Sequence, residues 1–529
     1  MSTLVENVNK VVAANAAIKD ALAAKGVDVT DYKKLSQAAE KIAAIETGGG
    51  GLDAETIAAA VSAMDGTTHD ATTETAASLA TSIKEITRKP NRRVLTTEDG
   101  TEVTENDIAA MTWDITEGVS AFAVAVSDTF PDGTARPHGL QFTIGWRQLL
   151  SGHTSYSVDW GDGTKTEGIT EDNPTHTYAK AGVYKIELSD DLNAFQMTRV
   201  VFDGNHGNTY NWNISAHCPR GDWSQVVEDD HTMGYWSVDN LMKVVRVLQW
   251  GASVTSALRT YQNCDSLVGT IPPWGESIIT ARYCYGWCAG LTGSVPPWTD
   301  KIGNGDGTYY NCSGLTGSIP DWGAAFVNLY STYEYCTGLT GTIPPWTDKM
   351  QVLSGVYAGC TGLTGSIPPW TDKITNANGT YSNCSGLTGT IPDWGAAVYN
   401  AGGTYSNCSG LTGTIPDWGA AITNAQSTYS NCSGLTGSIP AWGAAITNAY
   451  QTYCQCSGLT GSVPAWTDKI TNAYQCYYYC VGLTSVWDTS AADTELMPSA
   501  ITNKGYCFTG CDDRLRAYFK QAWGGSLSN

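Results

Sequence analysis

The C-terminal half of this sequence repeats every 24 residues. A tyrosine, a cysteine and a leucine return at steps of three residues, and a tryptophan fourteen residues before each cysteine keeps the same period. A fixed period of this length is typical of a solenoid, because one unit can bury its few apolar residues only against its neighbours. We therefore expect residues 248–511 to stack as coils around one long core. The cysteines that set the phase are Cys264, Cys288, Cys312, Cys336, Cys360, Cys384, Cys408, Cys432, Cys456 and Cys480.

Each coil has a pattern that predicts its local structure. The segment L-T-G-[ST]-[IV], followed in most coils by proline, predicts a short strand in a parallel ladder of about 4.8 Å per coil. The segment around the tyrosine and the cysteine predicts a short helical turn, which would place both side chains on one side. The cysteines are expected to be free, buried and small, because they form no C-x2-C pairs. Cys284 and Cys476 occupy a slot that is usually threonine, where a stray disulfide to a nearby column cysteine could form.

This order of aromatic residue, cysteine, leucine and tryptophan resembles the BspA-like leucine-rich repeat of bacterial surface proteins. Tyrosine here replaces the phenylalanine that is usual in that family. The resemblance covers about 260 residues. It implies adhesion and partner binding without enzymatic activity.

The strictly periodic aromatic residues are best explained as core, although exposed rings could stack on sugars or nucleobases. Better candidates for binding are the positions of the repeat whose residue changes from coil to coil. A stacked core needs the same residue in every coil, whereas a surface position does not. These columns lie six, two and one residues before each cysteine. They contain aromatic residues beyond those that packing needs. The candidate binding residues are Trp287, Tyr310, Tyr330, Tyr335, Tyr450, Tyr474, Tyr478 and Tyr479.

Residues 118–203 alternate apolar and polar positions and predict a small β-sandwich. The segment Trp160-Gly161-Asp162-Gly163, followed by His176 and Tyr178, predicts a hairpin turn and an aromatic-anchored strand. These residues resemble the PKD domain, an immunoglobulin-like module, which implies a spacer or presentation role without catalysis. Asp159 and Asp162 could bind a cation at this turn, but we favour the alternative that they cap it.

The remaining segments are predicted from shorter patterns. A heptad pattern from Leu4 to Leu22 predicts a coiled-coil-like helical attachment and oligomerisation segment over residues 1–47, with a monomeric helical hairpin as the alternative. A glycine-rich joint with short helices would follow over 48–117, and an irregular connector over 204–247. Apolar residues on one face of 512–529 predict a helical cap for the open end of the solenoid. The expected fold class is therefore multidomain: helices, a β-sandwich, a leucine-rich-repeat-type solenoid and a helical cap.

Composition and motifs exclude several classes of function. The net charge of −21 and the lack of a basic stripe argue against a nucleic-acid partner. No apolar stretch approaches the ~20 residues that a membrane span requires, and no secretory signal is evident. Phosphate-binding, zinc-protease, EF-hand and nucleophile-elbow motifs are missing, so we expect no enzyme, cofactor or metal. A hydrolase site hidden in 202–240 stays an open alternative.

Together these patterns predict a phage virion structural protein, such as a fibre or spike, assembled in the host cytoplasm. Its N-terminal helices would form a homo-oligomer, with a trimer favoured, and would contact other virion proteins. The solenoid would bind a host surface glycan or protein. Two alternatives are a bacterial cell-surface BspA-like adhesin and a purely architectural virion component without receptor binding.

Overall fold

The computed structural model describes residues 93–130, 135–136, 138–171, 173–197, 242–264, 266–486, 500–513 and 515–517. The chain divides into two compact units, Met1–Arg93 and Val94–Asn529, so all described residues except Arg93 belong to the second unit. The predicted N-terminal helical segment, most of the glycine-rich joint and most of the connector lie outside the described residues.

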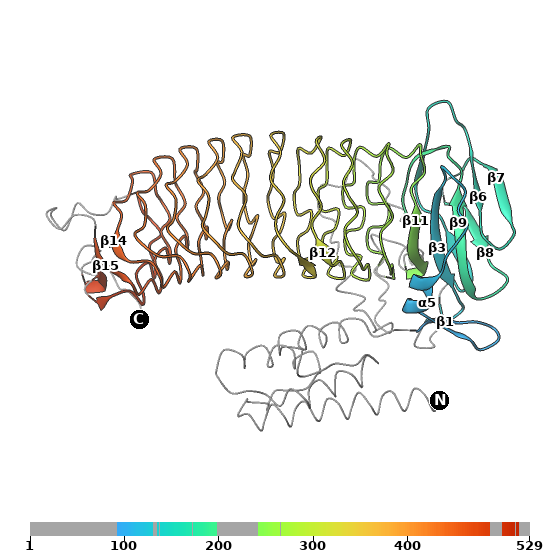
Figure 1. Ribbon diagram of the computed structural model, residues 1–529, viewed down its shortest axis with the longest axis horizontal. Coiled ribbons are helices and arrows are strands. Elements are labelled where there is room, and N and C mark those ends of the chain that lie inside the picture. Colours follow the sequence, from blue (N-terminus) through green and yellow to red (C-terminus); the bar gives the residue numbers. More distant parts are fainter. Residues whose placement is uncertain are drawn as a thin grey trace, which may run out of the picture. The chain divides into compact units, whose positions relative to one another are not determined.

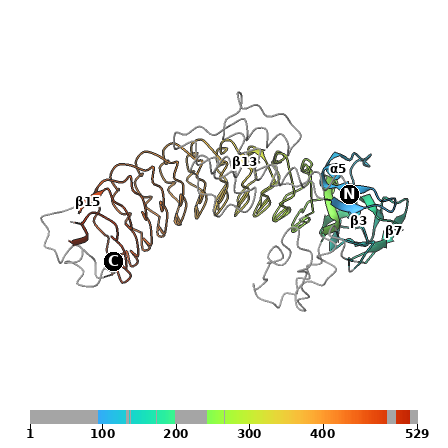
Figure 2. The same ribbon diagram turned by 90° about the horizontal axis from the view of Figure 1, so that it is seen from below.

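The fold class expected from the sequence is wrong. Among the described residues the structure is nearly all-β and contains no coiled-coil helix. Helix is limited to α5 (Glu105–Ala110) and to a few residues near Met242 and Leu515. The predicted C-terminal helical cap lies mostly outside the described residues. The sequence pattern correctly predicted a stack of coils. Figures 1 and 2 show this stack in two views turned by 90°.

Antiparallel strands form the first part of the second unit. A five-stranded sheet has the order β11-β3-β9-β6-β7, and the pairs β1-β2, β4-β8 and β5-β10 form smaller sheets. The strand β3, which lies between β11 and β9, is buried along its whole length, which explains its run of alanine, valine and phenylalanine. The strands are β1 (Arg93–Thr96), β2 (Glu102–Thr104), β3 (Ser120–Val126), β4 (Gln141–Thr143), β5 (Arg147–Leu149), β6 (Tyr156–Asp159), β7 (Lys165–Ile169), β8 (Thr175–Thr177), β9 (Gly182–Leu188), β10 (Leu192–Phe195) and β11 (Val244–Gln249).

The edge strand β11 joins this β-sheet part to the solenoid. It pairs antiparallel with β3, placing Val247 opposite Phe122, and the chain then enters the first coil. The rings of Phe122 and Phe195 lie 6.4 and 6.1 Å from the ring of Tyr261, the first tyrosine of the repeat. One continuous core therefore runs from the sheets into the coils. An open solenoid end would expose apolar side chains, and the sheets cover this one.

The coils are held together by two ladders of backbone hydrogen bonds. In the first ladder, a glycine of one coil bridges a leucine of the next in parallel fashion, as Gly389 bridges Leu411. The predicted strand is usually only this single bridge. It lengthens to a named strand in two places, where β12 (Gly317–Ser318) pairs with β13 (Leu339–Thr340) and β14 (Gly461–Val463) pairs with β15 (Leu483–Val486).

The second ladder, which we call the turn ladder, spans the eight residues before each cysteine and the cysteine itself. Alternate N–H groups donate to the next coil, as Tyr381 N does to the Thr404 carbonyl at 2.9 Å and Asn383 N to the Ser406 carbonyl at 2.7 Å. Two residues of each such segment have a left-handed backbone, for example Gly379 and Asn383, both with φ of 62°. This segment is therefore a series of tight turns, and the expectation of a helical turn is wrong.

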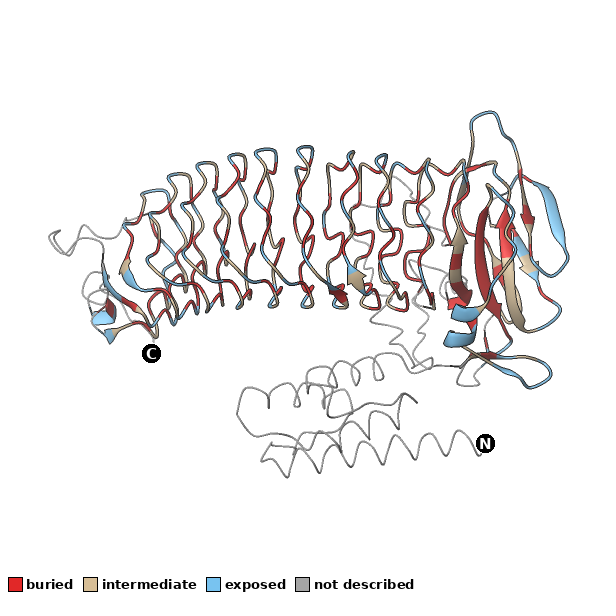
Figure 3. Ribbon diagram, viewed as in Figure 1, coloured by how far each residue is buried: buried red, intermediate tan, exposed pale blue. Residues whose placement is uncertain are grey.

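The side chains between the two ladders form the core. Stacked tyrosine rings lie 5.5 to 6.0 Å apart along the middle of the array, for example Tyr309 on Tyr333 and Tyr333 on Tyr357. The tryptophan rings also stack from coil to coil, as Trp394 does on Trp418 at 6.3 Å. Figure 3 shows the buried residues repeating from coil to coil. The periodic aromatic residues are core, as the constancy of their positions predicted.

Candidate binding surface

The turn ladder decides which side chains face solvent. The residues seven, four and three positions before each cysteine, and the cysteine, point into the core. The residues six, five, two and one positions before it are free to vary. All eight candidate binding residues occupy such positions. Tyr330, Tyr335 and Tyr479 are exposed, with 45 to 48% of their surface accessible, and the other five are half-buried.

Four aromatic residues on three successive coils form what we call the N-terminal aromatic cluster: Tyr283, Trp287, Tyr310 and Tyr335. The rings of Trp287 and Tyr310 are 4.7 Å apart, and those of Tyr310 and Tyr335 are 6.0 Å apart. Tyr283 lies 6.2 Å from Trp287 with an angle of 17° between the ring planes. The structure thus brings three of the candidate residues together and adds Tyr283, which the sequence analysis missed.

Charged side chains surround this cluster. The guanidinium groups of Arg259 and Arg282 lie 5.9 and 5.6 Å from the centre of the Tyr283 ring. The Arg282 Nε is 3.7 Å from a carboxylate oxygen of Asp306. The other oxygen of Asp306 accepts a hydrogen bond from the backbone N–H of Tyr330 at 3.1 Å. Cations over a ring face are attracted by its negative quadrupole, so these arginines hold Tyr283 in place.

Burial raises the pKa values of three groups in and around this cluster. The pKa of Asp306 is raised, because burial outweighs the hydrogen bond from Tyr330 and the charge of Arg282. The pKa of Glu334 is also raised by burial, despite a hydrogen bond from Ser331. Burial, aided by the charge of Glu334, raises the pKa of Tyr310 to about 12. Two half-buried carboxylates therefore lie close to solvent-facing rings.

A second group, which we call the C-terminal aromatic cluster, comprises Tyr450, Tyr474, Tyr478, Tyr479 and Tyr506. The rings of Tyr450 and Tyr474 stack at 5.4 Å, and Tyr506 meets Tyr474 edge-on at 5.8 Å. Tyr478 and Tyr479 are 4.6 Å apart. Tyr506 was missed because the phase of the repeat shifts by seven residues before it. The candidate residues of this end of the solenoid thus form two contacting sets.

Between the two clusters the turn ladder presents amide side chains. The Asn424 side chain donates to Asn400 at 2.9 Å, and the Asn448 side chain donates to Asn424 at 3.1 Å. The Asn407 amide donates to Asn383 in the same manner at 2.9 Å. These amides use one another as partners from coil to coil. The two aromatic clusters are therefore separated by a neutral, regularly hydrogen-bonded stretch.

The Asp-Gly turn of the β-sheet part uses its carboxylates internally. Asp159 accepts a hydrogen bond from Gly161 N at 2.9 Å. Asp162 accepts from Thr164 N at 3.0 Å through one oxygen and lies 2.7 Å from His176 Nε2 through the other. Among the described residues no three His, Cys, Asp or Glu side chains form a group that could hold a metal ion. These contacts match the capping alternative for the turn.

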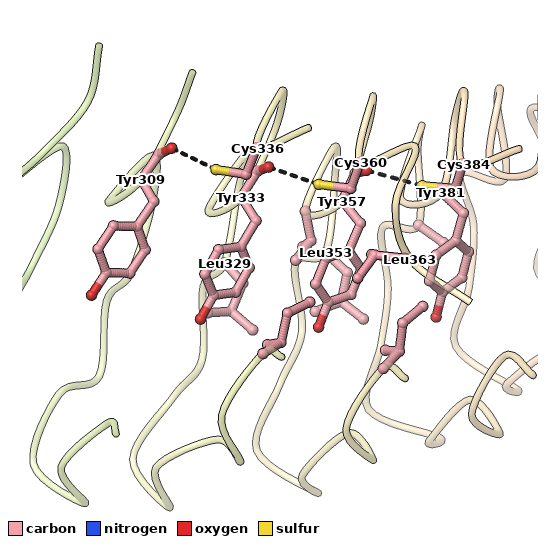
Figure 4. Packing of buried hydrophobic residues seen from close by; sticks show 14 of the residues in the cluster. Tyr309, Leu329, Tyr333, Cys336, Leu353, Tyr357, Cys360, Leu363, Tyr381 and Cys384 are labelled. Atoms are coloured by element: carbon pink, nitrogen blue, oxygen red, sulfur yellow. Dashed lines mark hydrogen bonds between the residues drawn. The ribbon is translucent and has the colours of Figure 1, made fainter. Parts of the chain in front are cut away.

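The cysteines of the array are free and buried. From Cys288 onward, each column thiol donates to the tyrosine carbonyl of the preceding coil, as Cys336 does to Tyr309 at 2.9 Å and Cys360 to Tyr333 at 3.0 Å (Figure 4). Burial raises the pKa of the Cys360 thiol well above its ordinary value. Since the thiolate is the reactive form, these cysteines are structural donors and poor nucleophiles.

No family model matches this chain, and no curated protein matches it either. Within the described ranges no helix is long and apolar enough to cross a membrane. The aromatic clusters on the turn ladder therefore have to be interpreted from their own chemistry.

Proposed function

We propose that this protein is a non-catalytic virion appendage whose solenoid displays a binding surface toward a host cell. The observation that carries the proposal is the presence of two clusters of aromatic side chains at the variable positions of the turn ladder. Aromatic residues dominate the energetics of protein interfaces, since they bury much surface and lose little conformational freedom. Neither cluster is needed to fill the core, which the tyrosine and tryptophan columns already occupy.

The stacked coils are well suited to presenting side chains to a binding partner. Each coil contacts only its neighbours, so the backbone of the turn ladder holds side chains at fixed intervals, while the surface columns vary without disturbing the core. The buried thiols act as hydrogen-bond donors in their reduced form. This arrangement is compatible with folding in a reducing cytoplasm, where a virion protein is made. Attachment to other virion proteins through residues 1–47, and the oligomeric state, stay predictions from the sequence.

The test is genetic. The gene would be inactivated in the genome that carries it, and the purified particles would be compared by electron microscopy, mass spectrometry and adsorption to host cells. We expect the protein in wild-type particles, and weaker adsorption without it. Particles that contain the protein but adsorb equally well without it would make it architectural and overturn the binding role. Its presence on the cell envelope, and not in particles, would indicate an adhesin and overturn the virion role.

A further inference from the structure

Several rings of the turn ladder are paired with glycine in the next coil. Tyr335 lies over Gly359, where an added Cβ would be 2.6 Å from the ring, and Tyr479 lies over Gly510, where it would be 2.7 Å away. An added Cβ at Gly307 would overlap the ring of Tyr283. In each pair the glycine occupies the same position of the repeat as the ring, one coil later. Asn383, by contrast, is followed in the next coil by another amide, Asn407, whose side chain donates to it at 2.9 Å.

This pairing fixes the orientation of the rings. Without a side chain below them, the rings of Tyr335 and Tyr479 lie on the backbone of the next coil, so that one face of each is covered and the other is turned to solvent. The exposed fractions of Tyr335 and Tyr479, 45 and 48%, agree with one open face. A flat ring held in this way is a rigid platform with a negative π-face.

A ligand for such a platform has to offer a flat face of weakly positive C–H groups together with polar groups at its edge. The pyranose ring of a sugar has both features. Nucleobases could also stack, but their phosphates would meet a chain of net charge −21 and the carboxylates of Asp306 and Glu334. A stable protein interface takes about 20–30 residues of each partner, many more than the four rings of this cluster. The chemistry therefore favours a sugar.

We propose that the N-terminal aromatic cluster is a carbohydrate-binding site that stacks a neutral pyranose on the open face of Tyr335. Tyr310 and Trp287, on the two preceding coils, extend the platform along the solenoid, and Tyr283 packs beside Trp287. Asp306 and Arg282 stand beside the platform as acceptor and donor for sugar hydroxyls. The inference rests on the proposed function, because it names the ligand class of that binding surface.

The experiment uses the full chain and a fixed panel of oligosaccharides: linear hexamers of glucose, mannose, galactose and N-acetylglucosamine, with a sialylated and a uronic acid-containing oligosaccharide for comparison. Binding would be measured by array fluorescence and by titration at up to millimolar sugar. We expect at least one neutral hexamer to bind, and Tyr335→Ser and Trp287→Ala each to weaken it at least tenfold. Near-ultraviolet circular dichroism would verify that each variant keeps its packed aromatic core.

A matched variant sharpens the result. Tyr399→Ser removes a tyrosine that is 48% exposed but belongs to neither cluster, and it is expected to bind as the wild type does. Equal binding by the wild type and Tyr335→Ser, or no binding of any neutral sugar by the folded chain, would overturn the carbohydrate site. If the chain nevertheless binds host cells, the proposed function stands and only the ligand class is wrong.

Discussion

The indole N–H of Trp298 donates to the hydroxyl of Tyr333 in the next coil at 2.8 Å, inside the core. The same bond joins Trp370 to Tyr405 and Trp418 to Tyr453. Other coils lack it. Trp322 Nε1 and the Tyr357 hydroxyl, one coil further along, are buried without a hydrogen-bond partner among the described residues. The tryptophan and tyrosine columns are thus joined by a polar contact in some coils and only by packing in others.

Tyr333→Phe would remove this acceptor and leave a buried indole N–H unpaired. We expect a loss of about 1–2 kcal/mol in the free energy of unfolding, measured by denaturant titration. The matched control is Tyr357→Phe, which removes a buried hydroxyl that has no partner. It should be neutral or stabilising. Equal losses from both substitutions would show that the hydrogen bond contributes nothing.

The threonines that stand four residues before most column cysteines form a buried threonine column. We expect their hydroxyl groups to stabilise the folded protein through hydrogen bonds to backbone carbonyls. Thr404 Oγ1 is 2.8 Å from the carbonyl of Ala377 in the preceding coil and 2.8 Å from that of Ala401 in its own coil. Thr404→Val keeps the shape and loses this bonding, so we expect it to destabilise the protein by about 1 kcal/mol. The chain has its own valine at this slot, Val356. Val356→Thr should be stabilising, and a destabilising effect there would contradict our account of the column. Thermal unfolding of both variants would decide.

A glycine two residues after every column cysteine from Cys288 onward lets neighbouring coils approach closely. A Cβ at Gly386 would lie 2.5 Å from the Leu363 carbonyl oxygen and 3.0 Å from that of Thr361. Gly386→Ala should therefore force the coils apart and cost about 3 kcal/mol or more, seen as a lower denaturant midpoint. Gly303→Ala is the control, since its Cβ would meet only the Ala325 carbonyl oxygen, at 3.4 Å. If both substitutions were tolerated equally, close approach at Gly386 would not be the reason for the glycine.

We expect the Asp162–His176 contact to make the thermal stability of the protein depend on pH in the acidic range. Burial alone would raise the pKa of Asp162, but hydrogen bonds from Thr164 and His176 outweigh it and lower that pKa. A lowered folded pKa gives stability that is present above the usual aspartate pKa and is lost as pH falls through the folded value. We expect the thermal midpoint to fall below about pH 4, and to fall less in Asp162→Asn. Glu167→Gln, which removes an exposed ion pair with Lys165, should leave the pH profile unchanged. Identical profiles for all three proteins would contradict this expectation.

The sequence predicted the core columns because every coil places the same residue in the same environment. It did not predict the turn ladder, because the left-handed positions are occupied by Asn383, Ser427, Gln451 and even Tyr335 as well as by glycine. Non-glycine residues rarely adopt a positive φ, so the residue types at these positions do not predict a left-handed backbone. Their N–H groups find partners only in the neighbouring coil, which a single repeat does not reveal.

The candidate surface was partly visible in the sequence for a related reason. The columns six, two and one residues before each cysteine vary, and the aromatic residues in them do face solvent. Tyr283 lies in the column five residues before Cys288, which the analysis of variable positions passed over. Its role depends on Gly307 in the next coil and on arginines from two coils. Relations of this kind follow from the stacking register, which is known only once the fold is known.

The sheets that close one end of the coil stack fix where the array can change in length. Each inserted or deleted 24-residue unit between the two aromatic clusters would move them apart or together by about 4.8 Å, without altering either cluster. Duplication or loss of whole repeat units can therefore change the distance between the two clusters in fixed steps. It would set the spacing of two contact points on a target, while the closed end and everything before it stay the same.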